Sequence, residues 1–324
     1  MSKNNMSRRD ALKIMGAGAA SLAAASVLSP VSYAGGKAES MLAGVGTGNM
    51  DLEDLMEEAA YMAAPQEGDA YKEPVVYKDE NVVFRQIDAH TWHGHGHLVF
   101  NESIYIIEGE KASLLIDAGT RIPGLAKIVA GITSKPVIFA VTHLHGDHAG
   151  SAIQEFPQMY VNAGGLPIVR GGIKGLEGMY KGEVKWLEDG QVFDLGGREI
   201  EVMFTPGHTP GCTTFFDKKN HVGFSGDSFG STNLLLNTNL STLISTTTRA
   251  AAYMQKFGIE KLYPGHYHGN DCETLQRVLD EKQMAEEVLE GKRKPQPNDQ
   301  KSNLNVIIRD KGVTIRFRDP EGIK

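Results

Sequence analysis

The run His143-Leu144-His145-Gly146-Asp147-His148 places three histidines and one aspartate within six residues, directly after the apolar residues 137–141. In an extended segment, residues separated by one position point to the same side, so His143 and His145 can bind one ion together. Asp147 and His148 follow at once and can face a second ion. An unliganded, solvated histidine loop is the alternative. The run therefore predicts a metal site in which one short loop serves two ions.

Three further segments run from an apolar strand into a metal-binding side chain. Residues 201–208 read Glu-Val-Met-Phe-Thr-Pro-Gly-His and end at His208. Residues 222–227 end at Asp227, and residues 259–266 end in Pro-Gly-His at His266. Loops that follow strands are where a rigid scaffold commonly positions a site. Together with the first run, they supply a full set of candidate ligands for two ions.

These motifs, in this order, resemble those of the metallo-β-lactamase superfamily over residues 82–318. The resemblance implies an α/β fold, a four-layer αββα sandwich with the metals at one open edge between the sheets. It also implies the division of the ligands. The first metal would be held by His143, His145 and His208, the second by Asp147, His148 and His266, with Asp227 between them.

The donor chemistry agrees with that division. Imidazole and carboxylate groups suit zinc, and also iron or manganese, whereas the absence of thiolate ligands argues against a purely structural site. Three protein ligands and a bridge leave each ion an open position, as in catalytic sites. We therefore expect two zinc ions, with iron or manganese as alternatives.

A binuclear site of this kind predicts a hydrolase. Two metals that share a hydroxide lower its pKa toward neutrality and direct it at an ester, lactone, thioester or amide of a small-molecule substrate. Asp147 is the best candidate to orient the water and move its proton. The β-lactamase branches tend to carry cysteine or serine where this chain has Asp227. The aspartate instead resembles the glyoxalase II and lactonase branches, so β-lactamase activity is a weaker expectation.

Two other classes of protein stay open. One is an oxygen-using enzyme with a single iron, similar to a persulfide dioxygenase, although the presence of both ligand sets favours two metals. The other is a non-catalytic metal-binding protein.

Further polar residues are candidates for contact with ligands or substrate. Asp117 ends a strand near the metal loop, where it would either hold a ligand imidazole or shape a turn. The stretch 90–97 contains His93, His95 and His97, and could be a loop over the cleft, a third metal site or a segment with no special role. Tyr267 and His268 could donate to a developing oxyanion or pack the loop.

The N-terminus resembles a twin-arginine export signal. Arg8 and Arg9 precede an Ala- and Gly-rich apolar run that ends at residue 28, and residues 31–34 offer a cleavage site. The run is short and rich in glycine for a bilayer span. We expect residues 1–34 to engage the twin-arginine translocation (Tat) export machinery. The mature protein should then be periplasmic or secreted, without stable membrane insertion.

The remaining chain divides into two parts. Residues 35–80 are polar and read as a leader or linker, with a short helix at 52–62. Residues 81–320 read as one hydrolase domain, and its oligomeric state is left open.

Net charge bears on the kind of partner, and the two cysteines raise the question of a disulfide. Loss of residues 1–34 removes four basic residues and one acid, which changes the net charge from −7 to −10. An acidic surface disfavours nucleic acid, so a nuclease is a weak reading. Export permits a disulfide between Cys212 and Cys272, but two separate thiols are favoured.

Periodicity and turn residues predict the elements of the domain. Strands are expected at 82–87, 102–108, 111–117, 158–162, 192–195, 199–204, 213–216 and 222–227, with a hairpin of 305–309 and 313–317. Helices are expected at 122–132, 148–155, 249–257 and 274–289.

Overall fold

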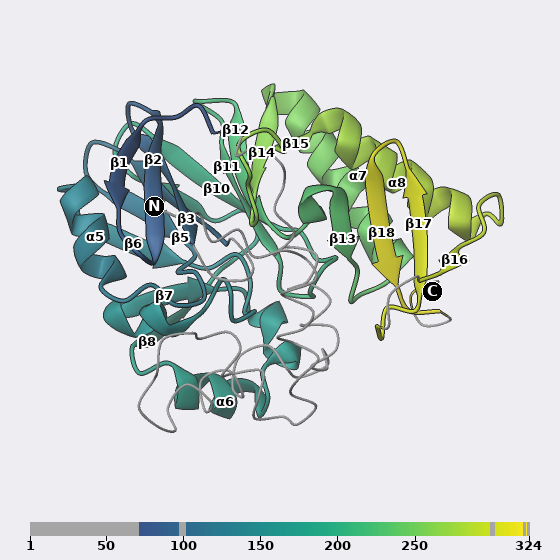
Figure 1. Cartoon of the computed structure of the whole chain (residues 1–324), viewed down its shortest axis with the longest axis horizontal. Coiled ribbons are helices and arrows are strands. Elements are labelled where there is room, and N and C mark those ends of the chain that lie inside the picture. Colours follow the sequence, from purple (N-terminus) through teal and green to yellow (C-terminus); the bar gives the residue numbers. More distant parts are fainter. Residues whose placement is uncertain (1–70, 97–101, 299–301, 320–321, 323–324) are drawn as a thin grey trace, which may run out of the picture.

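The computed structural model describes residues 71–96, 102–298, 302–319 and 322. The predicted export signal, the predicted leader helix at 52–62 and His97 lie outside these residues. In the described part, two sheets face each other and helices cover their outer faces, and a third sheet lies beyond the helices on one side (Figure 1). The expected αββα sandwich is confirmed, with this third sheet as an addition.

The N-terminal sheet has eight strands in chain order. Strands β1 to β5 are antiparallel to their neighbours and β5 to β8 are parallel. Their bounds are β1 (Val75–Lys78), β2 (Val82–Asp88), β3 (Thr91–Gly96), β4 (Ser103–Glu108), β5 (Ser113–Ile116), β6 (Val137–Ala140), β7 (Gln158–Val161) and β8 (Glu183–Trp186).

The middle sheet has the order β15-β14-β12-β11-β10-β9, and the C-terminal sheet has the order β13-β18-β17-β16. The bounds in the middle sheet are β9 (Val192–Asp194), β10 (Glu199–Phe204), β11 (Thr213–Asp217), β12 (Val222–Gly226), β14 (Lys261–Pro264) and β15 (Glu273–Thr274). Those in the C-terminal sheet are β13 (Asn233–Leu235), β16 (Gln296–Pro297), β17 (Val306–Asp310) and β18 (Val313–Phe317).

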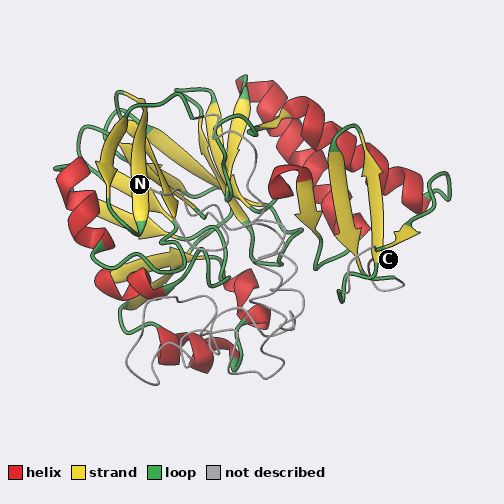
Figure 2. Ribbon diagram, viewed as in Figure 1, coloured by secondary structure: helices red, strands yellow, loops and turns green. Residues whose placement is uncertain are grey.

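Four α-helices and three short 3₁₀ turns complete the described fold (Figure 2). The helices are α5 (Leu125–Ile132), α6 (Gly172–Met179), α7 (Leu240–Phe257) and α8 (Leu275–Leu289). The 3₁₀ turns are η1 (Ser151–Glu155), η2 (Ala163–Ile168) and η3 (Gly230–Thr232). No helix within the described ranges is long and apolar enough to cross a bilayer.

Side chains that alternate between the two faces of the N-terminal sheet form a separate hydrophobic core on each face. On β4, Ile104 and Ile106 pack outward against α5, while Tyr105 and Ile107 pack inward against the middle sheet. Successive side chains of a strand point to opposite faces, so a strand buried on both faces is apolar throughout. Helices α7 and α8 pack against the middle sheet on one side and the C-terminal sheet on the other.

Several predicted elements differ from the structure. Only Ser151–Glu155 of the predicted helix 148–155 is helical, as a 3₁₀ turn, because the amides of Gly150 and Ser151 donate to the distant carbonyls of Gly119 and Thr120 and not to a preceding helical turn. Helix α7 begins at Leu240 and not at residue 249. Asn239 caps this earlier start, because its side chain accepts from the Thr242 amide. The stretch 90–97, for which a loop over the cleft was one of three alternatives, contains strand β3 over Thr91–Gly96.

Candidate metal centre

The candidate ligands all follow strands whose ends meet at one edge of the sandwich. The run from His143 to His148 comes after β6, and His208 comes after β10. Asp227 and His266 follow β12 and β14, which are parallel neighbours. The structure brings all of these side chains together in two buried groups, one of His143, His145 and His208 and the other of Asp147, His148, Asp227 and His266.

In the first group, three imidazole nitrogens face a common point. The Nε2 atoms of His143 and His208 lie 3.1 and 2.9 Å from Nδ1 of His145. Ligand nitrogens around a tetrahedral zinc ion are about 3.3 Å apart, so these spacings are those of donors to one ion. The other ring nitrogen of His208, Nδ1, lies 2.9 Å from the Leu235 carbonyl. A proton on Nδ1 leaves the lone pair of Nε2 directed into the group.

Burial keeps these imidazoles in the form that binds metals. It holds the pKa of His143 well below the ordinary value and also lowers the pKa of His208. It lowers the pKa of His145 to about 3. Neutral imidazoles offer lone pairs, so no proton has to leave before a cation binds.

In the second group, one oxygen occupies the centre. Oδ2 of Asp227 lies 3.4 Å from Nε2 of both His148 and His266. The same oxygen lies 3.8 Å from Nε2 of His143 and 3.6 Å from Nε2 of His208, which belong to the first group. Oδ2 of Asp147 lies 3.4 Å from Nε2 of His148 and of His266. Asp227 thus stands between the two groups, and Asp147 faces only the second.

The electrostatics of the second group favour positive charge. Burial alone would raise the pKa of Asp147 and Asp227, but the charges of His148 and His266 hold both pKa values well below the ordinary one. Burial would likewise lower the pKa of His148 and His266, yet the surrounding aspartates raise both pKa values well above normal. The two carboxylates therefore attract a cation into the group, whether a proton or a metal ion.

The donor atoms also fit a metal site because several of them lack hydrogen bonds. Oδ2 of Asp147, Nε2 of His148 and both carboxylate oxygens of Asp227 are buried, and none makes a hydrogen bond in the described part of the chain. Buried polar atoms are nearly always paired because an unpaired one destabilises the fold. Imidazole and carboxylate donors that converge in this way match zinc, iron or manganese.

Asp117 supports this group from behind. Its Oδ2 lies 2.8 Å from Nδ1 of His148, which leaves Nε2 of that ring to face the group. The Thr142 amide donates to Oδ1 over 2.6 Å, and the Thr142 hydroxyl donates to Oδ2 over 2.8 Å. The structure thus places Asp117 against the imidazole of the candidate ligand His148, the geometry that one of its two expected roles requires. Thr142 was not predicted, although it directly precedes the histidine run.

Gly265 is required for the close approach of two strands. A Cβ atom at this position would lie 2.1 Å from Oδ1 of Asp227 and 2.6 Å from Cε1 of His148. Both contacts are far below van der Waals distance. The glycine of the Pro-Gly-His motif therefore allows the chain after β14 to pass directly behind the candidate ligands Asp227 and His148.

The other candidate residues lie to one side of the centre. His93 and His95 sit on β3, and the ring of His93 packs against Tyr267 with centroids 5.2 Å apart. Tyr267 is buried in the core between the two sheets, a placement that favours the packing alternative over oxyanion contact. His268 lies close enough for its charge to affect the pKa of His93.

Glu102 is a buried group that sequence reasoning missed. Its Oε1 accepts from the Thr120 amide over 2.8 Å, and burial, reinforced by the charge of Asp147, raises its pKa. An acid directly before the apolar strand β4 was the only signal in the sequence.

The two cysteines are free thiols, as expected. Burial raises the pKa of each to about 12, so neither is a reactive thiolate. The Thr209 amide donates to Sγ of Cys212 over 3.2 Å, which ties the turn that follows His208.

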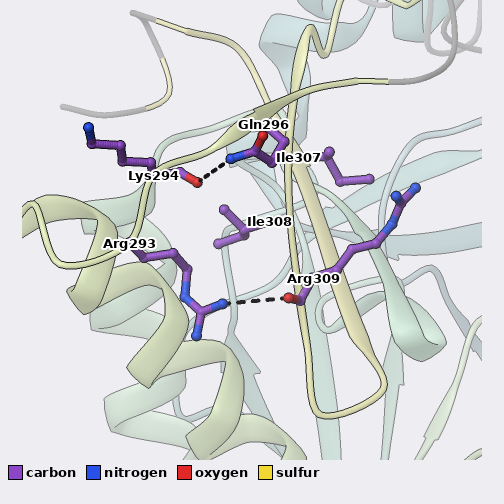
Figure 3. A pocket seen from close by; sticks show the side chains of 6 residues that line it. All are labelled: Arg293, Lys294, Gln296, Ile307, Ile308 and Arg309. Carbon is purple, nitrogen blue, oxygen red and sulfur yellow. Dashed lines mark hydrogen bonds between the residues drawn. The ribbon is translucent and has the colours of Figure 1, made fainter.

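A shallow hollow of about 230 Å³ lies on the C-terminal sheet, away from the metal centre (Figure 3). Its basic lining includes Arg293, whose guanidinium is already held by Glu287 at 2.8 Å and Asp310 at 2.7 Å. Because this charge is neutralised within the chain, the hollow gives no indication of a ligand.

Comparison with known proteins supplies the family. The family model described as the Metallo-beta-lactamase superfamily matches residues 97–266, which span every candidate ligand. The chain belongs to the metallo-β-lactamase superfamily. A solved member, a metallo-beta-lactamase from Pontibacter korlensis, aligns with a TM-score of 0.50 over 63% of this chain and 99% of that one. At 18% identity, this likeness speaks for the fold alone.

Curated relatives in the superfamily are named as hydrolases of acyl groups. The acyl-coenzyme A thioesterase MBLAC2 of Gallus gallus is 26% identical over 54% of this chain and 76% of its own length. The atrochrysone carboxyl ACP thioesterase of Aspergillus fumigatus is 27% identical over 63% of this chain and 48% of its own. The hydroxyacylglutathione hydrolase GloC of Haemophilus influenzae is 27% identical over 38% of this chain and 63% of its own.

Proposed function

We propose that this chain is a metal-dependent hydrolase of acyl bonds, with acyl thioesters as the favoured substrate class. The observation that carries the proposal is the position of Asp227 Oδ2, 3.4 to 3.8 Å from histidines of both groups. A carboxylate oxygen between two sets of donors fits a binuclear site. The thioester preference rests on the two relatives named thioesterases.

Each residue has a defined part in this proposal. His143, His145 and His208 hold one metal, and Asp147, His148 and His266 hold the other, with Asp227 shared. When bound, two zinc ions, or iron or manganese in their place, lower the pKa of water and polarise the acyl carbonyl. Asp147 is buried at the edge of the second group, where its carboxylate can orient a water molecule and take up its proton.

The test is a panel of hydrolysis assays on the zinc-loaded protein without residues 1–34. Acyl thioester, lactone, phosphodiester and β-lactam probes are compared side by side, and we expect the thioester to be cleaved fastest. Chelation should abolish activity and zinc should restore it. Asp147→Asn should lower kcat/KM by about 10²- to 10⁴-fold, as expected for the loss of a group that moves protons.

Asp319→Asn is the matched control, since Asp319 is exposed beyond the end of β18, and it should leave kcat/KM unchanged. Full activity of Asp147→Asn would remove that residue from the mechanism. Elemental analysis adds an independent result, because one iron per chain, in place of two metal ions, would favour an oxygen-using enzyme.

We also propose that the protein is exported through the twin-arginine route to the periplasm or the outside of the cell, where it acts on a small molecule. The motif at Arg8 and Arg9 supports this proposal.

A further inference from the structure

Two buried nitrogen atoms on the N-terminal sheet have no hydrogen-bond partner among the residues that the structure describes. Arg85 of β2 and His93 of β3 stand directly opposite each other in the antiparallel pair, so their side chains share one face. Nη1 of Arg85 and Nδ1 of His93 are both buried, and neither makes a hydrogen bond. A buried guanidinium nitrogen without an acceptor is destabilising unless a ligand supplies one.

Ser103 determines which nitrogen of His93 carries the proton. The Tyr267 amide donates to Oγ of Ser103 over 2.9 Å, and the same Oγ lies 2.9 Å from Nε2 of His93. The serine hydroxyl has one proton to donate, and in the tautomer in which it donates that proton to Nε2, Nδ1 carries the ring hydrogen. Nδ1 of His93 and Nη1 of Arg85 are therefore two donors without acceptors on one face.

The surroundings of His93 are electropositive. Burial holds its pKa well below the ordinary value, and the nearby positive charges of His95, Arg85 and His268 lower it further. A third metal ion in this place would meet a guanidinium and an N–H donor in place of lone pairs. The charge and the donors select an anion.

Tyr71 forms one wall of this cluster. The guanidinium carbon of Arg85 lies 4.2 Å from the centre of the Tyr71 ring, and that ring stacks on His93 with centroids 5.6 Å apart. The Tyr71 hydroxyl donates to the Tyr267 carbonyl, which fixes the wall in place. Stacking on the flat face of a guanidinium leaves its edge free to bind an oxyanion through two hydrogen bonds.

The cluster is connected to the metal centre through β4. The Ser103 amide donates to the carbonyl of Gly265 over 2.7 Å, and Gly265 directly precedes His266. Arg85 lies two strands away from β4 and two residues out of register with Ser103, a separation of roughly 12 Å. The two donors therefore lie within the span of a substrate molecule whose acyl bond is at the candidate metal centre.

We propose that Arg85 and His93 bind an oxyanion of the substrate, a carboxylate or phosphate carried by the acyl compound whose bond is cleaved at the metal centre. The substrate class becomes anionic acyl thioesters. This inference rests on the proposed hydrolytic function, so its test has one arm that needs no hydrolysis.

The kinetic arm compares a thioester with a carboxylate at the end of its acyl chain and its neutral methyl ester. Arg85→Met should raise KM for the anionic probe about 10- to 100-fold, the loss expected for a charged hydrogen-bond pair. It should leave kcat, and KM for the neutral ester, unchanged. Arg85→Lys keeps the positive charge but loses the paired N–H donors of the guanidinium, so its KM for the anionic probe should lie between those of wild type and Arg85→Met. Arg249→Met, an exposed arginine on α7, is the matched control.

The binding arm measures the thermal stability of the zinc-loaded protein with added acetate and, separately, with inorganic phosphate. At least one anion should raise the melting temperature of the wild type, the larger rise identifies the preferred oxyanion, and that rise should disappear in Arg85→Met. An equal rise in both proteins places the anion on the metals and overturns the inference. The inference is also overturned if Arg85→Met raises KM for the anionic thioester and for its neutral methyl ester by the same factor. If neither ester is cleaved but the anion effect still depends on Arg85, the anion site stands and the hydrolytic proposal falls.

Discussion

Asp117 has a strained backbone conformation beside the candidate metal centre. Its φ of 65° lies in the left-handed region that residues other than glycine rarely adopt. Two hydrogen bonds from Thr142 and one contact with His148 hold the carboxylate in this position. Backbone strain of this kind persists where surrounding contacts over-determine the conformation, and it is common beside functional sites.

Asp117→Asn should therefore weaken the second metal more than the first. Asparagine tolerates the left-handed backbone but cannot hold the His148 ring with a negative charge, and loss of such support typically lowers metal affinity about 10- to 100-fold. Metal titration with a competing chelator measures both sites. Asp194→Asn, at the exposed end of β9, serves as control. Equal weakening of the two metals, or none, would contradict the assignment.

At the scale of elements, the sequence predicts best where one physical signal dominates. The continuous apolar run of β4, which is buried on both faces, predicts this strand correctly. The Asp-Lys-Gly turn likewise predicts the C-terminal hairpin of β17 and β18. The first half of α7 was missed because its Ser and Thr residues hide the apolar spacing of Leu240 and Leu243. Arg85 was missed for another reason, since its role depends on strand pairing that a single segment does not reveal.

Helix α8 buries a carboxyl group without a partner. Glu281 is fully buried, and neither carboxylate oxygen makes a hydrogen bond in the described part of the chain. Burial, together with the charge of Glu273, raises its pKa well above normal. Burial likewise raises the pKa of Glu273 to about 8. Both acids are thus more easily protonated in the folded chain than in the unfolded one.

This pair predicts a stability that falls as pH rises. Between pH 4.5, where a free glutamate titrates, and about 8, the folded chain binds more protons than the unfolded one. Stability from the protonated acids is complete below that interval and is lost above it. The difference in the free energy of unfolding between Glu281→Gln and wild type should therefore favour the variant more at pH 9 than at pH 5.

Urea unfolding at both pH values measures this difference. Glu290→Gln, exposed at the end of α8, is the matched control and should show no such dependence. A constant difference between Glu281→Gln and wild type at the two pH values would contradict the pKa assignment.

At the scale of the whole molecule, the proposed export can be tested directly. Arg8→Lys combined with Arg9→Lys should retain the protein inside the cell, because the twin-arginine route reads the arginine pair itself. Fractionation followed by immunoblotting measures the distribution. Arg170→Lys combined with Arg249→Lys makes the same chemical change in the mature domain and should be exported normally. Equal export of the two double variants would exclude this route.

The third sheet joins distant parts of the chain at the metal centre. The carbonyl that holds Nδ1 of His208 belongs to Leu235 of β13, and β13 pairs in parallel with β18. During synthesis, the histidine loops therefore emerge from the ribosome well before the strand that anchors β13 beside His208. The order of translation thus delays the final geometry of the group of His143, His145 and His208 until Val313–Phe317 has been made.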